Sequence, residues 1–207
     1  MLAGDIDATW AGYDRFAGWP VPVVVVAGNH EFDGRELDRA WPEFRERCER
    51  LGFRLLQREA LNLDLPGGRV RLLGATRWSD FDLFGSAGRE RAVRAAGYFL
   101  RLMNATRGGR PLDAAALREE GLACRAWLEH ALAMPAPQGA ATVVITHFAR
   151  ELAAIADPLV LWGPTVFARP IKHLEPELDG DDVGVILAAK PDVAHRRPSR
   201  AMRFTIV

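Results

Sequence analysis

Three short polar clusters follow apolar stretches of the sequence, and their residue types could bind a metal ion. Asp5 follows the apolar start of the chain, Asn29 and His30 follow the β-branched run at 21–27, and His147 follows a second such run. A carboxylate, an amide oxygen and an imidazole together suit Mn, Fe or Zn, whereas calcium prefers oxygen alone. A site of this composition can activate water near neutral pH and neutralise a phosphate.

Each cluster taken alone also has a simpler explanation. Asp5 could cap the helical segment that follows it, and Asn29 with His30 could form a turn, because asparagine tolerates left-handed backbone geometry. His147 could be a hydrogen-bonded histidine at a strand end. The occurrence of all three clusters in one chain, each directly after an apolar strand, favours a shared site.

The periodicity of apolar residues predicts the elements that position these clusters. The wholly apolar run at 21–27 indicates a strand buried on both faces, and apolar residues at three- and four-residue spacing predict an amphipathic helix at 35–51. Further strands are predicted at 53–56, 60–63 and 70–73 as a β-meander, with helices at 89–103 and 114–133 and a buried strand at 142–145. This alternation predicts a layered α/β fold with the polar clusters at the carboxyl ends of neighbouring parallel strands.

The three clusters resemble motifs of the calcineurin-like metallophosphoesterases. Residues 2–6 (Leu-Ala-Gly-Asp-Ile), 28–31 (Gly-Asn-His-Glu) and 144–147 (Val-Ile-Thr-His) look like three of the family's five motifs. Residues 73–81 also resemble a segment from a bacterial branch of these enzymes. The resemblance implies a layered α-β-β-α sandwich, incomplete in this chain, with two sheets flanked by helices.

The resemblance also implies roles for the polar residues. Asp5 would bridge two divalent metal ions, and Asn29 and His147 would be ligands of the second ion. His30 would not bind metal; it would contact the phosphate and stabilise the transition state or protonate the leaving oxygen. The implied reaction is hydrolysis of a phosphomonoester or phosphodiester by a metal-activated water.

Other residues could support this site from the second shell or the pocket wall. Glu31 or Asp33 could orient the imidazole of His30. The remaining candidates for the pocket are Trp78, Asp80 and Arg150.

Two family motifs have no counterpart in this chain. The Asp-x-His motif of the family's first strand, which supplies the ligands of the first metal, is missing, and Ala-His-Arg-Arg at 194–197 stands where Gly-His-x-His is expected. We expect a partial phosphoesterase domain at 1–193 and an irregular basic tail at 194–207. Our hypothesis is a start codon assigned too late and a frame shift after Val193. An uninterrupted frame without an upstream coding extension would contradict it.

The missing motifs bear on the number of metal ions. The family uses two ions of Mn, Fe or Zn, and only one position retains a set of ligands, namely Asp5, Asn29 and His147. Three protein ligands can hold one ion while water completes the coordination. The alternative function is therefore a catalytically impaired remnant, or a metal- or ligand-binding module of the same fold.

Composition limits the class of protein. The 207 residues, 49% hydrophobic and 26% charged, suit one globular α/β domain. Because 27 basic residues balance 27 acidic ones, nucleic acid is not an expected partner. The sequence contains two cysteines and no apolar run of membrane-spanning length, and it lacks the layout of a signal peptide, so we expect a cytoplasmic protein without a membrane partner. The expected substrate is a phosphorylated small molecule or a nucleotide, and the sequence does not predict the oligomeric state.

Overall fold

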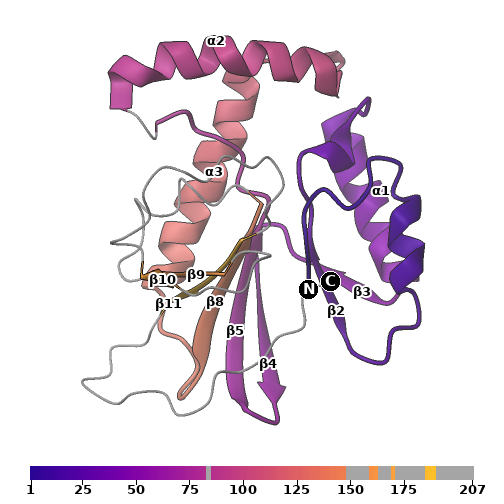
Figure 1. Cartoon of the computed structure of the whole chain (residues 1–207), viewed down its shortest axis with the longest axis vertical. Coiled ribbons are helices and arrows are strands. Elements are labelled where there is room, and N and C mark those ends of the chain that lie inside the picture. Colours follow the sequence, from indigo (N-terminus) through magenta and orange to yellow (C-terminus); the bar gives the residue numbers. More distant parts are fainter. Residues whose placement is uncertain (83–84, 148–158, 163–168, 171–184, 190–207) are drawn as a thin grey trace.

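The computed structural model describes residues 1–82, 85–147, 159–162, 169–170 and 185–189, the last three ranges through their strand pairing (Figure 1). The strands are β1 (Leu2–Ala3), β2 (Val23–Val26), β3 (Phe53–Leu55), β4 (Glu59–Leu65), β5 (Gly68–Ala75), β6 (Thr106–Arg107), β7 (Arg110–Pro111), β8 (Ala141–Thr146), β9 (Leu159–Trp162), β10 (Arg169–Pro170) and β11 (Val185–Ala189). The helices are α1 (Leu37–Arg50), α2 (Gly85–Met103) and α3 (Ala114–Ala133), with 3-10 turns at Ala11–Phe16 and His30–Phe32.

The described strands form two main sheets and a short β-ribbon. The first sheet has the order β1-β2-β3 and is parallel throughout. The second has the order β10-β9-β11-β8-β5-β4, in which β5 and β8 are parallel and the other neighbours are antiparallel. Strands β6 and β7 form the ribbon. The chain is therefore a mixed α/β protein.

The β-meander predicted for residues 53–73 is wrong. Strand β3 pairs in parallel with β2 in the first sheet, and only β4 and β5 form an antiparallel hairpin. Parallel neighbours need a long crossover connection, and α1 supplies it between β2 and β3. The amphipathic helix thus provides the connection that allows β3 to pair in parallel with β2.

Strand β2 is buried on both faces, as its valine run predicts. Val23 and Val25 belong to an apolar cluster with Leu37 and Phe44 of α1. The alternate residues of β2 belong to a second cluster that joins the two sheets, made of Val24, Val26, Leu56, Val70, Leu72, Val143 and Ile145. Because side chains alternate across a strand, one short run of valines packs against both a helix and the other sheet.

The helices cover the sheets from outside. Helix α1 contacts β3, α3 contacts β5, and α2 contacts α3. Figure 1 shows α1 beside the first sheet and α2 crossing the end of α3. This arrangement is compatible with the predicted α/β class.

Helix α2 exposes an apolar patch. Tyr98, Phe99 and Leu102 each expose more than half of their surface, while Leu100 and Met103 are buried. None of the helices in the described part of the chain is long and apolar enough to cross a membrane. The basic tail predicted at 194–207 lies outside the described residues.

Candidate functional site

The predicted ligands lie in turns that directly follow strands. Asp5 comes two residues after β1, and Asn29 lies in the turn that follows β2. These strands are parallel neighbours, with Ala3 paired to Val26, so their carboxyl ends share one edge. His147 follows β8, which belongs to the second sheet. The expectation of neighbouring strands therefore holds for Asp5 and Asn29, while His147 reaches them from the other sheet.

Two side chains converge on one ring nitrogen of a third. Nε2 of His147 lies 3.1 Å from Oδ2 of Asp5 and 3.1 Å from Oδ1 of Asn29. The side chains of His147 and Asp5 are 5% and 12% exposed. The structure thus brings together the three residues that the sequence analysis selected as metal ligands.

Two glycines allow this close approach. A Cβ at Gly28 would overlap Oδ1 of Asp5, and a Cβ at Gly4 would overlap the ring of His147 at Nδ1. Gly4 and Asp5 also have positive φ angles of 89° and 49°. A side chain at either glycine would push a candidate ligand out of place.

The surroundings of Asp5 favour its ionised form. Burial raises the pKa of Asp5, but the hydrogen bond and charge of His147 outweigh this effect. The backbone N–H of His30 also donates to Oδ1 of Asp5 at 3.1 Å. The net result is a pKa below the ordinary value for an aspartate. Asp5 is therefore an anionic carboxylate at neutral pH, as a metal ligand must be.

His30 lies at the open side of the cluster. Its side chain is 55% exposed, and its Nδ1 lies 2.8 Å from Oδ2 of Asp33. Burial lowers the pKa of His30, but the hydrogen bond that Asp33 accepts from the imidazole and the charges of Asp5, Asp33 and Glu31 raise it above the ordinary value. Of the two carboxylates considered as orienting partners, Asp33 is the one that contacts the imidazole.

Glu31 has a different place, which the sequence did not indicate. Its side chain is fully buried, and the imidazole of His30 forms its hydrogen bond with Asp33 instead. Its carboxylate accepts hydrogen bonds from the backbone N–H groups of Asp5 (3.0 Å), Ile6 (2.7 Å), Asp7 (3.2 Å) and Gly28 (2.6 Å), and from the hydroxyl of Tyr13 (3.1 Å). This residue holds the two turns that carry the cluster.

Tyr13 and Trp10 enclose Glu31. Burial and then the charge of Glu31 raise the pKa of Tyr13, so the phenol keeps its proton and donates to the carboxylate. Nε1 of Trp10 donates to the backbone carbonyl of Glu31 at 2.7 Å. In the sequence, the only indication of this arrangement is one acidic residue, Glu31, and two aromatic residues, Trp10 and Tyr13, close to the polar clusters.

Trp78 and Asp80, considered above as pocket residues, lie in the interior. They are 1% and 2% exposed, and Asp80 pairs with the buried guanidinium of Arg77 at 3.2 Å. The backbone carbonyl of Trp78 also lies close to Gly121 of α3, where a Cβ would approach it to 2.6 Å. These contacts join the loop to α3. Arg150 lies outside the described residues.

The donor types are compatible with one divalent ion. In the described part of the chain no three His, Cys, Asp or Glu side chains gather as a metal site, and the third donor beside Asp5 and His147 is the amide oxygen of Asn29. Adjacent ligands around an ion with bonds of about 2.1 Å are separated by about 3.0 Å at right angles. The two separations from Nε2 of His147 are 3.1 Å, which is close to this value and is also the length of a hydrogen bond.

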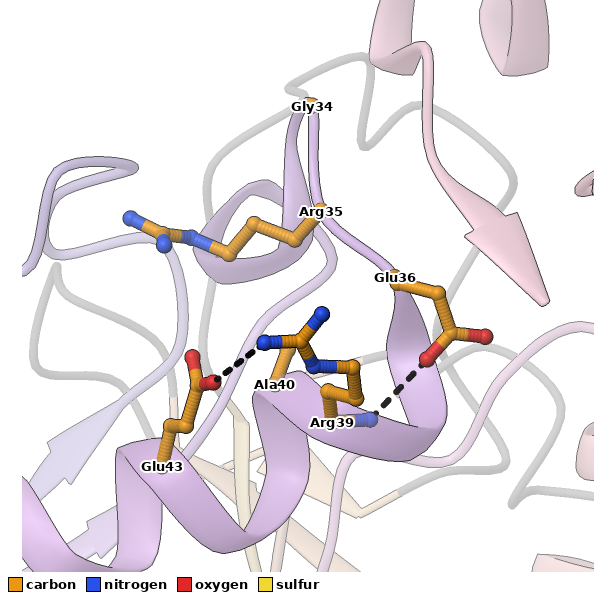
Figure 2. A pocket seen from close by; sticks show the side chains of 6 residues that line it. All are labelled: Gly34, Arg35, Glu36, Arg39, Ala40 and Glu43. Carbon is orange, nitrogen blue, oxygen red and sulfur yellow. Dashed lines mark hydrogen bonds and ion pairs between the residues drawn. The ribbon is translucent and has the colours of Figure 1, made fainter. Parts of the chain in front are cut away.

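A separate surface hollow lies at the start of α1 (Figure 2). Its lining residues are Gly34, Arg35, Glu36, Arg39, Ala40 and Glu43. The backbone N–H of Arg39 donates to Glu36 at 3.0 Å, and its guanidinium lies 3.9 Å from Glu43. Figure 2 shows Arg39 between these two carboxylates. The charges of the hollow are balanced internally, and its lining includes none of the three clustered ligands.

No protein-family model, no curated protein and no solved structure matches the chain. The functional interpretation therefore depends on the motif resemblance of the sequence and on the contacts described above.

Proposed function

We propose that the chain is a calcineurin-like metallophosphoesterase that hydrolyses phosphate esters. The observation that carries the proposal is the convergence of Asp5 and Asn29 on Nε2 of His147, each at 3.1 Å, from turns of two different sheets. Two packed sheets with helices outside also agree with the layered sandwich that the resemblance implies. The substrate would be a phosphomonoester or phosphodiester of a small molecule or nucleotide.

Asp5, Asn29 and His147 would hold a divalent ion of the Mn, Fe or Zn class. When bound, such an ion lowers the pKa of water and offsets the negative charge of a phosphate. Asp5 is ionised at neutral pH, so its carboxylate needs no deprotonation before it binds a cation. Asn29 adds a neutral oxygen donor, so the three ligands leave a net positive site for an anionic substrate.

His30 would act on the phosphate from the exposed side of the cluster. Its Nδ1 is engaged by Asp33, so Nε2 is the atom that can donate to a phosphate oxygen or to the leaving oxygen. The raised pKa increases the protonated fraction of His30 near neutral pH. The backbone N–H of His30 donates to Oδ1 of Asp5, which ties the backbone of this residue to the ligand cluster.

The test is Mn²⁺-dependent hydrolysis of p-nitrophenyl phosphate and bis-p-nitrophenyl phosphate. We expect Asp5→Asn and His147→Ala to lower kcat/KM by about 100-fold or more, because the first removes the negative charge and the second the imidazole of the ion site. The matched controls are Asp14→Asn and His130→Ala, whose side chains are exposed; they should stay within about twofold, the usual effect of surface changes.

Two results would contradict the proposal. The first is absence of hydrolysis by a wild-type protein that is folded by circular dichroism and loaded with Mn²⁺, which favours the impaired remnant. The second is hydrolysis that Asp5→Asn and His147→Ala leave unchanged. Comparison of the two substrates separates monoesterase from diesterase activity.

A further inference from the structure

Glu31 is a buried carboxylate whose hydrogen-bond partners are neutral. Its five bonds come from the backbone of residues 5–7, from Gly28 and from the hydroxyl of Tyr13. A buried carboxylate is unfavourable unless hydrogen bonds satisfy its oxygens. Backbone N–H groups that donate to an ionised carboxylate make strong, short bonds. The hydrogen bonds that satisfy the Glu31 carboxylate therefore also hold the donating backbone and hydroxyl groups in place.

These donors come from two separate turns. Oε2 accepts from Asp5 at 3.0 Å and from Gly28 at 2.6 Å, so one oxygen joins the turn after β1 to the turn after β2. Oε1 accepts from Ile6 at 2.7 Å and from Asp7 at 3.2 Å. The first turn carries Asp5, and the second leads into Asn29.

The turn after β1 has an unusual backbone conformation. Asp5 has a φ of 49°, a left-handed conformation that is uncommon outside glycine, although aspartate adopts it more readily than most residues. Such a conformation persists when the surrounding structure determines it. The carboxylate of Glu31 lies beside this residue and accepts the N–H groups on its own position and on the next two.

In the 3-10 turn at His30–Phe32, two adjacent side chains have opposite exposure. The side chain of His30 is 55% exposed at the site, whereas Glu31 is fully buried. The indole of Trp10 donates to the carbonyl of Glu31 at 2.7 Å and fixes its backbone. The short polar motif thus presents one side chain to solvent and directs the next one inward.

We propose that Glu31 is the positioning residue of the Asp5–Asn29–His147 site. Its carboxylate gathers the two turns so that Asp5 faces His147 and Asn29. The part of this inference that concerns metal binding rests on the proposed function, and the part that concerns the turns does not.

The test is Glu31→Gln in the full chain. Glutamine keeps the size of the side chain but replaces one acceptor oxygen with an NH₂ donor, so backbone N–H groups that shared that oxygen lose their acceptor. The matched control is Glu46→Gln, which changes an exposed glutamate paired with Arg50 on α1. Three quantities are measured by NMR and calorimetry: amide hydrogen exchange, contacts between Gly4 and the His147 ring, and Mn²⁺ affinity.

We expect selective changes in Glu31→Gln. Amides of residues 5–7 and 28 should exchange at least about 10-fold faster while α3 amides stay protected, since loss of a local acceptor opens only the local structure. The nuclear Overhauser contacts between Gly4 Hα and the His147 ring should disappear. The Mn²⁺ affinity should fall about 10- to 100-fold, the usual effect of removing a residue that orients metal ligands. Glu46→Gln should resemble the wild type in all three.

The outcomes separate this proposal from the proposed function. The positioning role is overturned if Glu31→Gln shows the same amide exchange rates and the same Gly4–His147 contacts as the wild type. Unchanged Mn²⁺ affinity in a variant whose turns have opened also overturns it. If the wild type binds no Mn²⁺, the proposed function fails, and exchange and Gly4–His147 contacts still decide the role of Glu31.

If Glu31→Gln does not fold, a measurement on the wild-type protein still tests the proposal. Through-hydrogen-bond couplings from the amide nitrogens of Ile6 and Gly28 to the carboxyl carbon of Glu31 support the proposal. Their absence, with rapid exchange of the same amides, overturns it.

Discussion

Nε2 of His147 lies 3.1 Å from Oδ1 of Asn29, although 118 residues separate the two in the sequence. Asn29 follows a strand of the first sheet, and His147 follows a strand of the second. The contact exists because the apolar cluster between the sheets brings the ends of β2 and β8 together. The candidate site is therefore a product of tertiary packing and not of one local motif.

Asp33→Asn should lower the pKa of His30. The raised pKa depends on the hydrogen bond and charge of Asp33. Because the folded-state pKa exceeds the unfolded value of about 6.5, the pair stabilises the fold fully below that value, and the contribution disappears as pH rises through the folded-state pKa. An NMR titration of the His30 ring measures the change. Asp38→Asn, on the exposed first turn of α1, is the control. An unchanged midpoint in Asp33→Asn would show that Asp33 does not orient the ring.

His147→Ala should raise the pKa of Asp5. Burial opposes ionisation of Asp5, and the hydrogen bond and charge of His147 outweigh it in the intact protein. The depressed pKa means that ionised Asp5 stabilises the fold above the unfolded value of about 3.9, and that this contribution is lost as pH falls through the lower folded value. Carboxyl-carbon NMR follows the titration, with His130→Ala as control. A midpoint that stays depressed in His147→Ala would contradict the assigned contact.

Gly28→Ala should destabilise the domain by about 1–3 kcal/mol, because the added methyl group overlaps the carboxylate of Asp5. Gly97→Ala on α2 is the matched change in open space, where the flexible end of Arg101 lies 4.0 Å from the added methyl group. It should stabilise by about 0.5–1 kcal/mol, since alanine favours a helix over glycine. Urea unfolding measures both. Equal effects of the two substitutions would mean that Gly28 is not required for close packing.

Asp80→Ala should lower the free energy of unfolding by about 3–5 kcal/mol, because it removes the carboxylate that faces the buried guanidinium of Arg77. Glu46→Ala removes an exposed partner of Arg50 and should cost about 0.5 kcal/mol or less. Thermal unfolding compares the two. A small effect of Asp80→Ala would show that the interior pair contributes little to stability.

Local sequence signals predicted the elements better than their pairing. The helix predicted at 114–133 agrees with α3, which begins after the capping carboxylate of Asp113. Helix α2 starts at Gly85, ahead of the predicted residue 89. The partners of β3 and β8 could not be read from periodicity, because pairing depends on contacts distant in the sequence.

The candidate site was predictable to the same extent. Apolar runs followed by polar residues identified Asp5, Asn29 and His147, which the fold brings into contact. The inward direction of Glu31 was not predictable, because a 3-10 turn sets it. The burial of Asp80 was equally hidden, since it depends on packing against α3 and on the interior guanidinium of Arg77.

The three candidate ligands follow strands of two different sheets, so an ion bound by them would connect the two sheets. A cation held by Asp5, Asn29 and His147 would link the edge of one sheet to the edge of the other. It would act in addition to the valines and leucines that pack between the sheets. Separation of the layers would then require release of the ion. Ion binding at this small site would raise the melting temperature of the whole domain, because a ligand that binds only the packed state shifts the global unfolding equilibrium.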